Sequence, residues 1–260
     1  MRVEVHHVID AGGDLPPEAP TIVLANSLGS THRMWDKQIP RLMQHFRVVR
    51  YDTRGHGRSP VPAGPYSIDD LTDDLVALLD RLALARVHLV GLSLGGMTAM
   101  RLAIREPARV DRLVVLCSSA RLEPESAWRQ RAATVREHGT GAVAAAVLER
   151  WYTPPWRAAH PAAADAAAAA IAATPAEGYA GCCEAISSMN QVQDLSRITA
   201  PTLAIAGADD PATPPAHLQL IADRVQDGRL LVVANAAHLA NDEQPEAITT
   251  AILDHLTAGA

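Results

Sequence analysis

Residues 87–105 connect a short apolar segment to a helical pattern through the pentapeptide Gly91-Leu92-Ser93-Leu94-Gly95. A serine between two glycines, placed after a strand and before a helix, is typical of a sharp turn that lifts the serine hydroxyl clear of a sheet. The serine of such a turn has a strained backbone, and only small neighbours let the strand and the helix approach so closely. The segment therefore predicts an α/β fold in which Ser93 is a nucleophile, and a plain glycine-rich helix cap is the alternative.

Apolar and β-branched segments alternate with helical patterns over most of the chain, which indicates a mostly parallel sheet with crossover helices on both faces. The predicted strands are Val3–Ile9, Thr21–Ala25, Arg47–Tyr51, Val87–Val90, Leu113–Cys117, Thr202–Ala206 and Leu230–Val233. The predicted helices are Ile68–Leu82, Leu94–Arg105, His217–Val225 and Pro245–Leu256. Ser67 and the carboxylates of Asp69 and Asp70 favour a helix beginning at Ile68.

The region from residue 120 to residue 193 differs from the rest of the chain. It is helix-prone, contains the alanine-rich tracts 142–146 and 162–170, and has no convincing strand. Alanine favours helix but buries little area per residue, so these tracts predict modestly packed surface helices. We expect a helical cap at residues 120–193, inserted into an α/β core formed by residues 1–119 and 194–260.

Composition excludes several classes of protein. Hydrophobic residues make up 48% of the 260 residues and charged residues 20%, so a large core is available and disorder is not expected. The net charge of -6 argues against a nucleic-acid partner. No segment reads as a signal peptide or a membrane span, and the three cysteines cannot form a framework of several disulfides. We therefore expect a soluble, cytoplasmic protein; nothing in the sequence indicates its oligomeric state.

A serine hydroxyl needs a base, and the base needs a partner that fixes its tautomer. In this kind of fold the acid and then the histidine follow the serine along the chain. Asp210 lies three residues after Gly207, beyond a predicted strand, whereas Asp209 is interpreted as a solvated turn residue. His238 lies between the last strand and the last helix. Asp210 and His238 are therefore the predicted acid and base, and most of the other histidines are expected on the surface or in satisfied contacts.

Acyl transfer also needs hydrogen-bond donors for the oxyanion. The backbone N–H of Leu94, directly after the nucleophile, is one candidate. The N–H of Leu28, in the loop Asn26-Ser27-Leu28-Gly29-Ser30 after the second strand, is the other, although this segment could be a plain connecting loop. No H-E-x-x-H, clustered Cys/His, P-loop or G-x-G-x-x-G motif is present, so we expect no metal and no cofactor.

With these residues in place, the chain resembles the α/β-hydrolase superfamily along nearly its whole length and, more narrowly, the 3-oxoadipate enol-lactonases. Asn26-Ser27, where many superfamily members have His-Gly, makes the narrower match more specific. The remaining matching segments are Met34-Trp35-Asp36, Asp52-Thr53-Arg54-Gly55-His56-Gly57, Gly91–Gly96, Ala237-His238-Leu239-Ala240-Asn241 and, in the cap, Trp128-x-x-Arg131 and Trp151-Tyr152-x-Pro154.

The resemblance implies hydrolysis of a small anionic lactone, 3-oxoadipate enol-lactone, to 3-oxoadipate through an acyl-enzyme, in the β-ketoadipate pathway of aromatic-acid breakdown. The substrate's carboxylate requires a cation or several donors in the pocket. Arg131 is the candidate, one helical turn from Trp128, although a solvated arginine is an equal alternative. Trp128 and Trp151 would line the pocket or belong to the core of the cap.

Three functions fit this pattern of residues. The first is the enol-lactonase, and the second is a general carboxylesterase or a C–C hydrolase of ring-cleavage products, which the same triad would serve. A non-catalytic sensor on the same fold is the third, and the intact set Ser93, Asp210 and His238 argues against it.

Overall fold

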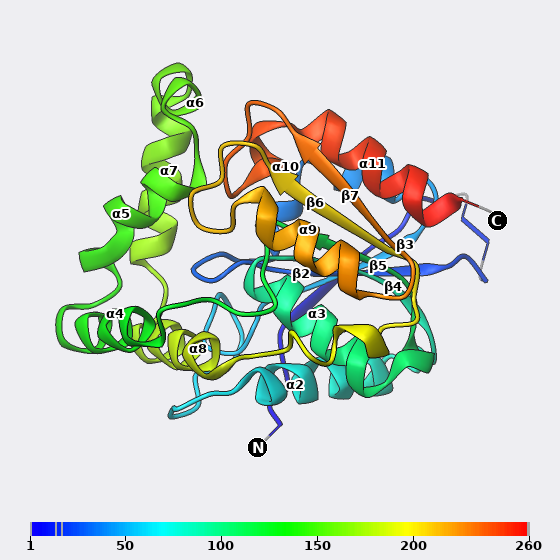
Figure 1. The fold of residues 1–260 in the computed structure, drawn as a ribbon, viewed down its shortest axis with the longest axis horizontal. Helices are drawn as coiled ribbons and strands as arrows, with labels where there is room; N and C mark the ends of the chain where they lie inside the picture. Colours follow the sequence, from blue (N-terminus) through cyan, green and yellow to red (C-terminus); the bar gives the residue numbers. More distant parts are fainter. Residues whose placement is uncertain (1, 14, 17, 259–260) are drawn as a thin grey trace.

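A single sheet organises the molecule in the computed structural model, which describes residues 2–13, 15–16 and 18–258 (Figure 1). Its strands lie in the order β1-β3-β2-β4-β5-β6-β7. β1 pairs with β3 antiparallel and every other neighbouring pair is parallel. The strands are β1 (His7–Asp10), β2 (Thr21–Ala25), β3 (Arg47–Tyr51), β4 (Val87–Leu92), β5 (Val110–Leu116), β6 (Thr202–Gly207) and β7 (Gly228–Val233).

Helices cover both faces of this sheet. Apolar side chains of α2 (Ile68–Arg81), α3 (Leu94–Arg105) and α9 (Pro215–Arg224) pack on one face, and those of α1 (Ile39–Leu42) and α11 (Pro245–Thr257) pack on the other. All residues of β2, β4 and β6 are buried, as expected of parallel strands covered on both sides. The predicted α/β class with a mostly parallel sheet is confirmed. The shorter helical segments are η1 (His32–Trp35), η2 (Pro107–Arg109), η3 (Leu195–Arg197) and α10 (Ala240–Glu243).

The first residue of α2 is set by local hydrogen bonds. The Ser67 hydroxyl accepts from the N–H of Asp70 (3.1 Å), and the Asp70 carboxylate accepts from the N–H of Ser67 (3.0 Å). This capping box satisfies two amide groups that the first turn of a helix leaves without partners. The predicted start of the helix at Ile68 is confirmed.

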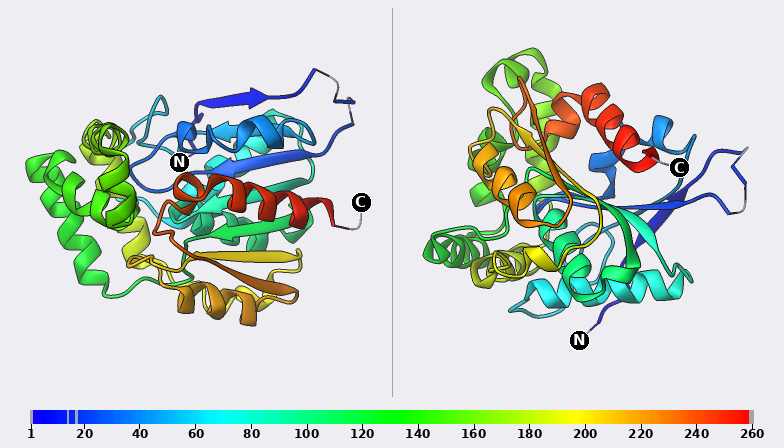
Figure 2. Two further views of the ribbon diagram at one scale, coloured as in Figure 1. Left: turned by 90° about the horizontal axis from the view of Figure 1, so that it is seen from above. Right: turned by 45° about the vertical axis from the view of Figure 1, so that its right-hand side comes forward.

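The chain between β5 and β6 forms five α-helices, which lie together beyond one end of the sheet (Figure 2). We call them the cap helices: α4 (Glu125–His138), α5 (Gly141–Trp151), α6 (Pro154–Ala159), α7 (Pro161–Ala172) and α8 (Ala176–Ser188). In α7, the alanine-rich helix, only Ala164 and Ile171 are buried. The division at residues 120 and 193 stays a prediction.

A contact between two glycines joins α8 to the loop after β3. A Cβ atom on Gly178 would lie 2.3 Å from the Cα of Gly55, closer than side-chain carbons pack, and a Cβ on Gly55 would meet Gly178 at the same distance. Gly55 also has a φ of +74°, in the left-handed region that favours glycine. The two backbones therefore touch only because neither residue carries a side chain.

The first strand is shorter than predicted, because it begins at His7 rather than at Val3. Val5 is buried in the core, but the N–H of Val3 donates to a carboxylate oxygen of Asp74 on α2 (2.7 Å) instead of to a neighbouring strand. The apolar-polar-apolar alternation of Val3, Glu4 and Val5 thus comes from burial of one side of this segment, which does not pair with a neighbouring strand. Within the described residues, no helix combines the length and the apolar character needed to cross a membrane.

Candidate active site

Ser93 lies in the turn between β4 and α3, with φ 55° and ψ −116°. A Cβ on Gly91 would lie 2.3 Å from the carbonyl oxygen of Gly95, and one on Gly95 would lie 2.3 Å from the carbonyl oxygen of Ala25 on β2. Backbone therefore occupies the space next to both glycines, which explains the G-x-S-x-G spacing. The turn holds the serine side chain above the end of the sheet, as the sequence predicts.

His238 and Asp210 come from the loops after β7 and β6 and form a hydrogen-bonded pair. The Nδ1 atom of His238 lies 2.8 Å from a carboxylate oxygen of Asp210. Both residues are buried, whereas Asp209 beside them is exposed. The choice between the two aspartates follows from the turn: the N–H of Asp209 bonds the carbonyl of Ala236, and only Asp210 faces the imidazole.

Thr213 completes the surroundings of the acid, and sequence reasoning missed it. Its hydroxyl and its N–H donate to Asp210 (2.7 and 3.1 Å), and the N–H of Ala212 donates as well (2.8 Å). Burial by itself raises the pKa of Asp210, but His238 and the Thr213 donors outweigh it and hold that pKa at about 2. Asp210 is therefore charged at neutral pH and can stabilise a protonated His238.

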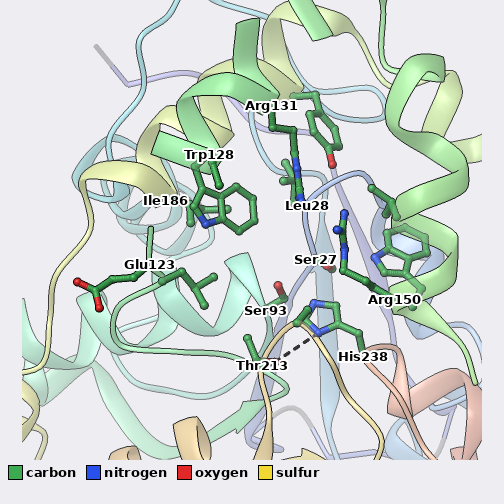
Figure 3. A pocket seen from close by; sticks show the side chains of 16 residues that line it. Ser27, Leu28, Ser93, Glu123, Trp128, Arg131, Arg150, Ile186, Thr213 and His238 are labelled. Atoms are coloured by element: carbon green, nitrogen blue, oxygen red, sulfur yellow. Dashed lines mark hydrogen bonds between the residues drawn. The ribbon is translucent and has the colours of Figure 1, made fainter. Parts of the chain in front are cut away.

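Ser93 and His238 meet at the floor of a cavity of about 220 Å³ (Figure 3). The Ser93 hydroxyl points into this cavity beside the imidazole of His238, and the Thr213 hydroxyl lies 3.4 Å from Nδ1 of the same ring. The cavity is closed on the opposite side by residues of α4, α5 and α8. The three residues predicted to form a triad are thus brought together from three separate strand ends.

Leu28 and Leu94 are the predicted donors for an oxyanion. Leu28 lines the cavity, and Leu94 is the first residue of α3. Among the described residues, no acceptor pairs with the backbone N–H of either one. Two N–H groups that have no acceptor near a nucleophile are the arrangement that stabilises a developing oxyanion.

Asn26 holds the loop that carries Leu28, and its side chain points away from the cavity. The Asn26 amide donates to the carbonyl of Tyr51 (2.5 Å), and its oxygen accepts from the indole N–H of Trp35 (3.2 Å). Asn26 is fully buried. The Asn-Ser pair therefore acts here through loop geometry, since Asn26 fastens β2 to β3 and to η1.

His56, a residue that sequence reasoning did not single out, also fixes this loop. Its Nε2 accepts from the N–H of Gly29 (2.9 Å), and its Nδ1 lies 3.1 Å from the carbonyl of Arg54. An acceptor on one nitrogen and a donor on the other require the neutral imidazole. Burial lowers the pKa of His56 and so favours that neutral form. Only the RGHG match to the family could have pointed to this residue.

Two arginines line the side of the cavity that faces Ser93. Arg131 extends from α4 with its guanidinium 4.5 Å from the ring centre of Trp128, and Arg150 extends from α5 next to Ser27 (Figure 3). Neither forms an ion pair with any described residue. Burial, and then the charge of Arg131, lower the pKa of Arg150. Two like charges without a counter-ion favour the binding of an anion between them.

The structure places Trp128, Arg131 and Trp151 at the cavity, as predicted, and adds Arg150, Tyr179 and Ser27. Trp151 is buried and packs in the core as well, so both sequence interpretations of it apply at once. Arg150 was not distinguishable from the other cap arginines in the sequence. Its position depends on how the end of α5 packs on the loop of His238.

Outside the cavity, His6, His32 and Asp52 bring potential metal-ligating atoms within 4.8 Å of one another in the described part of the chain. Asp52 is buried, and one of its oxygens already accepts from the backbone N–H of His32 (2.8 Å) and lies 2.9 Å from its Nδ1. The other oxygen accepts from the N–H of Arg58 (3.0 Å). These hydrogen bonds already occupy both oxygens of Asp52, and they explain its burial as a residue that holds its loop in place.

The assembled parts are those of acyl transfer. A hydroxyl, an imidazole that can take its proton, a buried carboxylate behind the imidazole and two backbone donors surround one small cavity. Such a set can form and break an ester through a covalent intermediate.

Comparison with known proteins agrees with this geometry. The family model described as "alpha/beta hydrolase fold" matches residues 20–245. 3-oxoadipate enol-lactonase 2 of Acinetobacter baylyi is 39% identical over 235 residues, which are 90% of this chain and 88% of that protein. The crystal structure of the enol-lactonase from Burkholderia xenovorans LB400 superposes with a TM-score of 0.94 at 39% identity, covering 98% of this chain and 97% of that one. A thermophilic esterase from Thermogutta terrifontis superposes at 0.90 with 27% identity, covering 98% and 93%. The chain therefore belongs to the α/β-hydrolase family and, within it, to the 3-oxoadipate enol-lactonases.

Proposed function

We propose that this protein hydrolyses 3-oxoadipate enol-lactone to 3-oxoadipate, with Ser93, His238 and Asp210 as its catalytic triad. One observation carries the proposal: the cavity that holds Ser93 and His238 on its floor has Arg131 and Arg150, two cations without an ionic partner in the described structure, on its opposite wall. A small ester that bears a carboxylate could place its ester carbonyl at Ser93 and its carboxylate at the two arginines. The relatives named as enol-lactonases act on a substrate of that kind.

In the first half of the reaction Ser93 attacks the lactone carbonyl while His238 takes the hydroxyl proton. The N–H groups of Leu28 and Leu94 hold the oxyanion, and Asp210 stabilises the imidazolium. The ring C–O bond then breaks, and the leaving oxygen departs as an enol that becomes the ketone of the product. Because an enol leaves more readily than an ordinary alcohol, His238 needs to give it little assistance.

In the second half His238 activates a water molecule, which attacks the acyl-Ser93 carbonyl and releases the new carboxylate. The free carboxylate of the substrate stays between Arg131 and Arg150 through both steps. Charge-assisted hydrogen bonds from a guanidinium suit this task, because they are short and directional. The volume of about 220 Å³ favours a small substrate over a long-chain ester.

The test is a steady-state assay of the purified protein on the enol-lactone and on p-nitrophenyl acetate, a neutral ester. We expect turnover of the lactone by the wild type and none by Ser93→Ala. Arg131→Ala and Arg150→Ala each raise KM for the lactone about 10- to 100-fold, from the ~1.5–3 kcal/mol of a hydrogen bond to a charged group, and leave KM for the neutral ester unchanged.

Arg129→Ala is the matched control, because Arg129 lies on the same helix but is exposed and pairs with Glu125. A wild-type protein that is inert on the lactone and fast on simple esters would instead identify a general esterase, like the structurally similar esterase of Thermogutta terrifontis. Failure of a fluorophosphonate probe to label Ser93 would point to a non-catalytic protein.

A further inference from the structure

The cap segment 150–153 and the loop 237–239 lie side by side and are joined by backbone hydrogen bonds. The N–H of His238 donates to the carbonyl of Arg150 (3.3 Å), and the N–H of Leu239 donates to the carbonyl of Trp151 (2.9 Å). The main chains of Arg150 and His238 are therefore adjacent, while Figure 3 shows the Arg150 side chain extending toward Ser27. The main chain of a residue proposed to bind the substrate's carboxylate thus holds the main chain of the proposed base.

Glu243, on α10, connects the same two segments through its buried carboxylate. One oxygen accepts from the N–H of Ala237 (2.5 Å). The other accepts from the N–H and from the hydroxyl of Thr153 (2.9 and 2.7 Å). Glu243 is 8% exposed and forms no ion pair with a described residue, so N–H and O–H donors alone hold its charge.

Neighbouring contacts strengthen this junction. The hydroxyl of Tyr152 donates to the carboxylate of Asp242 (2.7 Å), and the Thr153 hydroxyl also accepts from the N–H of Trp156 (3.4 Å), at the start of α6. Three consecutive amides, of Ala237, His238 and Leu239, therefore all donate to Glu243 or to the cap. A loop with every amide fixed in this way has little freedom to move its imidazole.

We propose that Glu243 is a positioning residue that fastens the loop of His238 to the cap segment 150–153, so that the base and the anion-binding Arg150 are set by one group of hydrogen bonds. The proposal rests on the proposed function for the role of Arg150, but its effect on His238 concerns any ester substrate. Small misplacements of a catalytic group cost large factors in rate, about 100-fold for about 1 Å. Glu243 acts through His238 and touches no substrate.

The test measures kcat and KM on p-nitrophenyl acetate and on the enol-lactone for Glu243→Gln, Thr153→Val and Thr153→Ser. In Glu243→Gln the NH₂ group must face either the backbone N–H of Ala237 or that of Thr153; both are donors, so one of these two N–H bonds is lost. Turnover is expressed per active site, titrated with a fluorophosphonate, so that misfolded protein does not count. Glu246→Gln is the matched control, since Glu246 is an exposed glutamate on the next helix that pairs with Arg41.

We expect kcat per titrated site to fall about 10- to 100-fold in Glu243→Gln on both substrates, with KM for the neutral ester within about twofold of the wild type. In Thr153→Val we expect kcat per titrated site to fall about threefold or more. In Thr153→Ser, which keeps the hydroxyl, we expect kcat to stay near the wild-type value. In Glu246→Gln both kcat per titrated site and KM are expected to equal those of the wild type. If Glu243→Gln does not fold, the two Thr153 variants decide.

Values of kcat per titrated site within twofold of the wild type in every variant that folds would overturn the proposal and leave Glu243 a purely structural residue. A wild type that turns over the ester but not the lactone contradicts the proposed function alone, because the ester still measures the positioning of His238.

Discussion

The backbone of Ser93 has φ 55° and ψ −116°, a conformation that is costly for any residue with a side chain. The glycines on either side remove steric obstacles, but the serine itself keeps the strain. That strain is compensated by the packing of β4 and α3, whose residues are buried nearly throughout. Reactivity and stability are thus opposed at this one position.

Ser93→Gly is expected to abolish activity and to raise the free energy of unfolding by about 1 kcal/mol, because glycine relieves ~1–3 kcal/mol of strain while adding flexibility to the unfolded chain. Urea denaturation measures it. Ser93→Ala is the matched control: it is equally inactive, but a Cβ remains and the strain with it. Equal stability of the two variants would show that the turn is not strained.

Some site residues could be predicted from the sequence and others could not. Ser93, Asp210 and His238 each lie in the turn or loop after a predicted strand. The carboxyl ends of parallel strands meet at one edge, so the meeting of these residues was predictable. Thr213 and Arg150 act through the direction in which their side chains point. That direction depends on how separate segments pack against one another, which no local pattern contains.

At the scale of elements, the end of α5 separates two cavities. Trp151 lines the cavity of about 220 Å³ at Ser93 and also a second one of about 380 Å³, which is walled by Met34 and by Ala166, Ala167 and Ala170 of α7. The second cavity is mostly apolar in its lining. Because Trp151 lines both cavities, we expect it to limit the length of the acyl chain that fits beside Ser93.

Trp151→Ala is expected to join the two cavities and to raise the ratio of kcat/KM for p-nitrophenyl hexanoate over acetate about tenfold, the value of burying roughly two additional methylenes. The variant loses about 3–5 kcal/mol of stability, so the assay is run well below its Tm. Trp156→Ala, in the ring stack beside Tyr152 but at neither cavity, should leave the ratio alone. An unchanged ratio in Trp151→Ala would mean that another group sets the limit.

Helix ends were more predictable than the first strand. The helix predicted at Leu94–Arg105 has those bounds in the structure, since the turn before it and Pro107 after it are local signals. β1 begins four residues later than predicted, because the pattern at Val3–Val5 reports burial and cannot report which groups the backbone bonds. The cap was recognisable as helical, but not which of its arginines face the cavity.

Across the whole molecule, buried histidines couple stability to pH. His56, His88 and His255 are each at most 5% exposed, and burial lowers the pKa of each below its ordinary value of 6.5. His255 uses both nitrogens as a neutral ring, bonding the carbonyl of Pro201 and a guanidinium N–H of Arg229. The lowered pKa values favour the neutral rings in the folded protein, so unfolding at a pH below 6.5 is accompanied by proton uptake.

The free energy of unfolding is therefore expected to fall between pH 7 and pH 5. The histidine contribution is complete above pH 6.5 and is lost as the pH drops below it, because the unfolded chain then binds more protons; each such proton adds about 1.4 kcal/mol per pH unit to the slope. Urea denaturation at several pH values measures the slope. His255→Asn should flatten it, and His138→Asn, which changes an exposed ring, should not. A stability that stays level or rises toward pH 5 would contradict this account.

The fold class followed from the alternation of apolar strands and helical patterns, while the order of the strands did not. The sequences of parallel strands of similar composition, such as β2 and β4, do not indicate which strands lie beside them. Only the three-dimensional pairing sets the order β1-β3-β2-β4-β5-β6-β7. The family resemblance implied the α/β-hydrolase fold and its mostly parallel sheet, and the strand order comes from the structure alone.

The glycine contact between α8 and the loop after β3 has a consequence for protein engineering. Exchanging caps between relatives is an obvious route to new substrate ranges, and it treats the cap as a replaceable module. Gly178 and Gly55 face each other across that boundary, one on each side of the graft. A transplanted cap that brings any larger residue to position 178 would collide with the recipient's main chain, so a chimera has to inherit the two glycines as a pair.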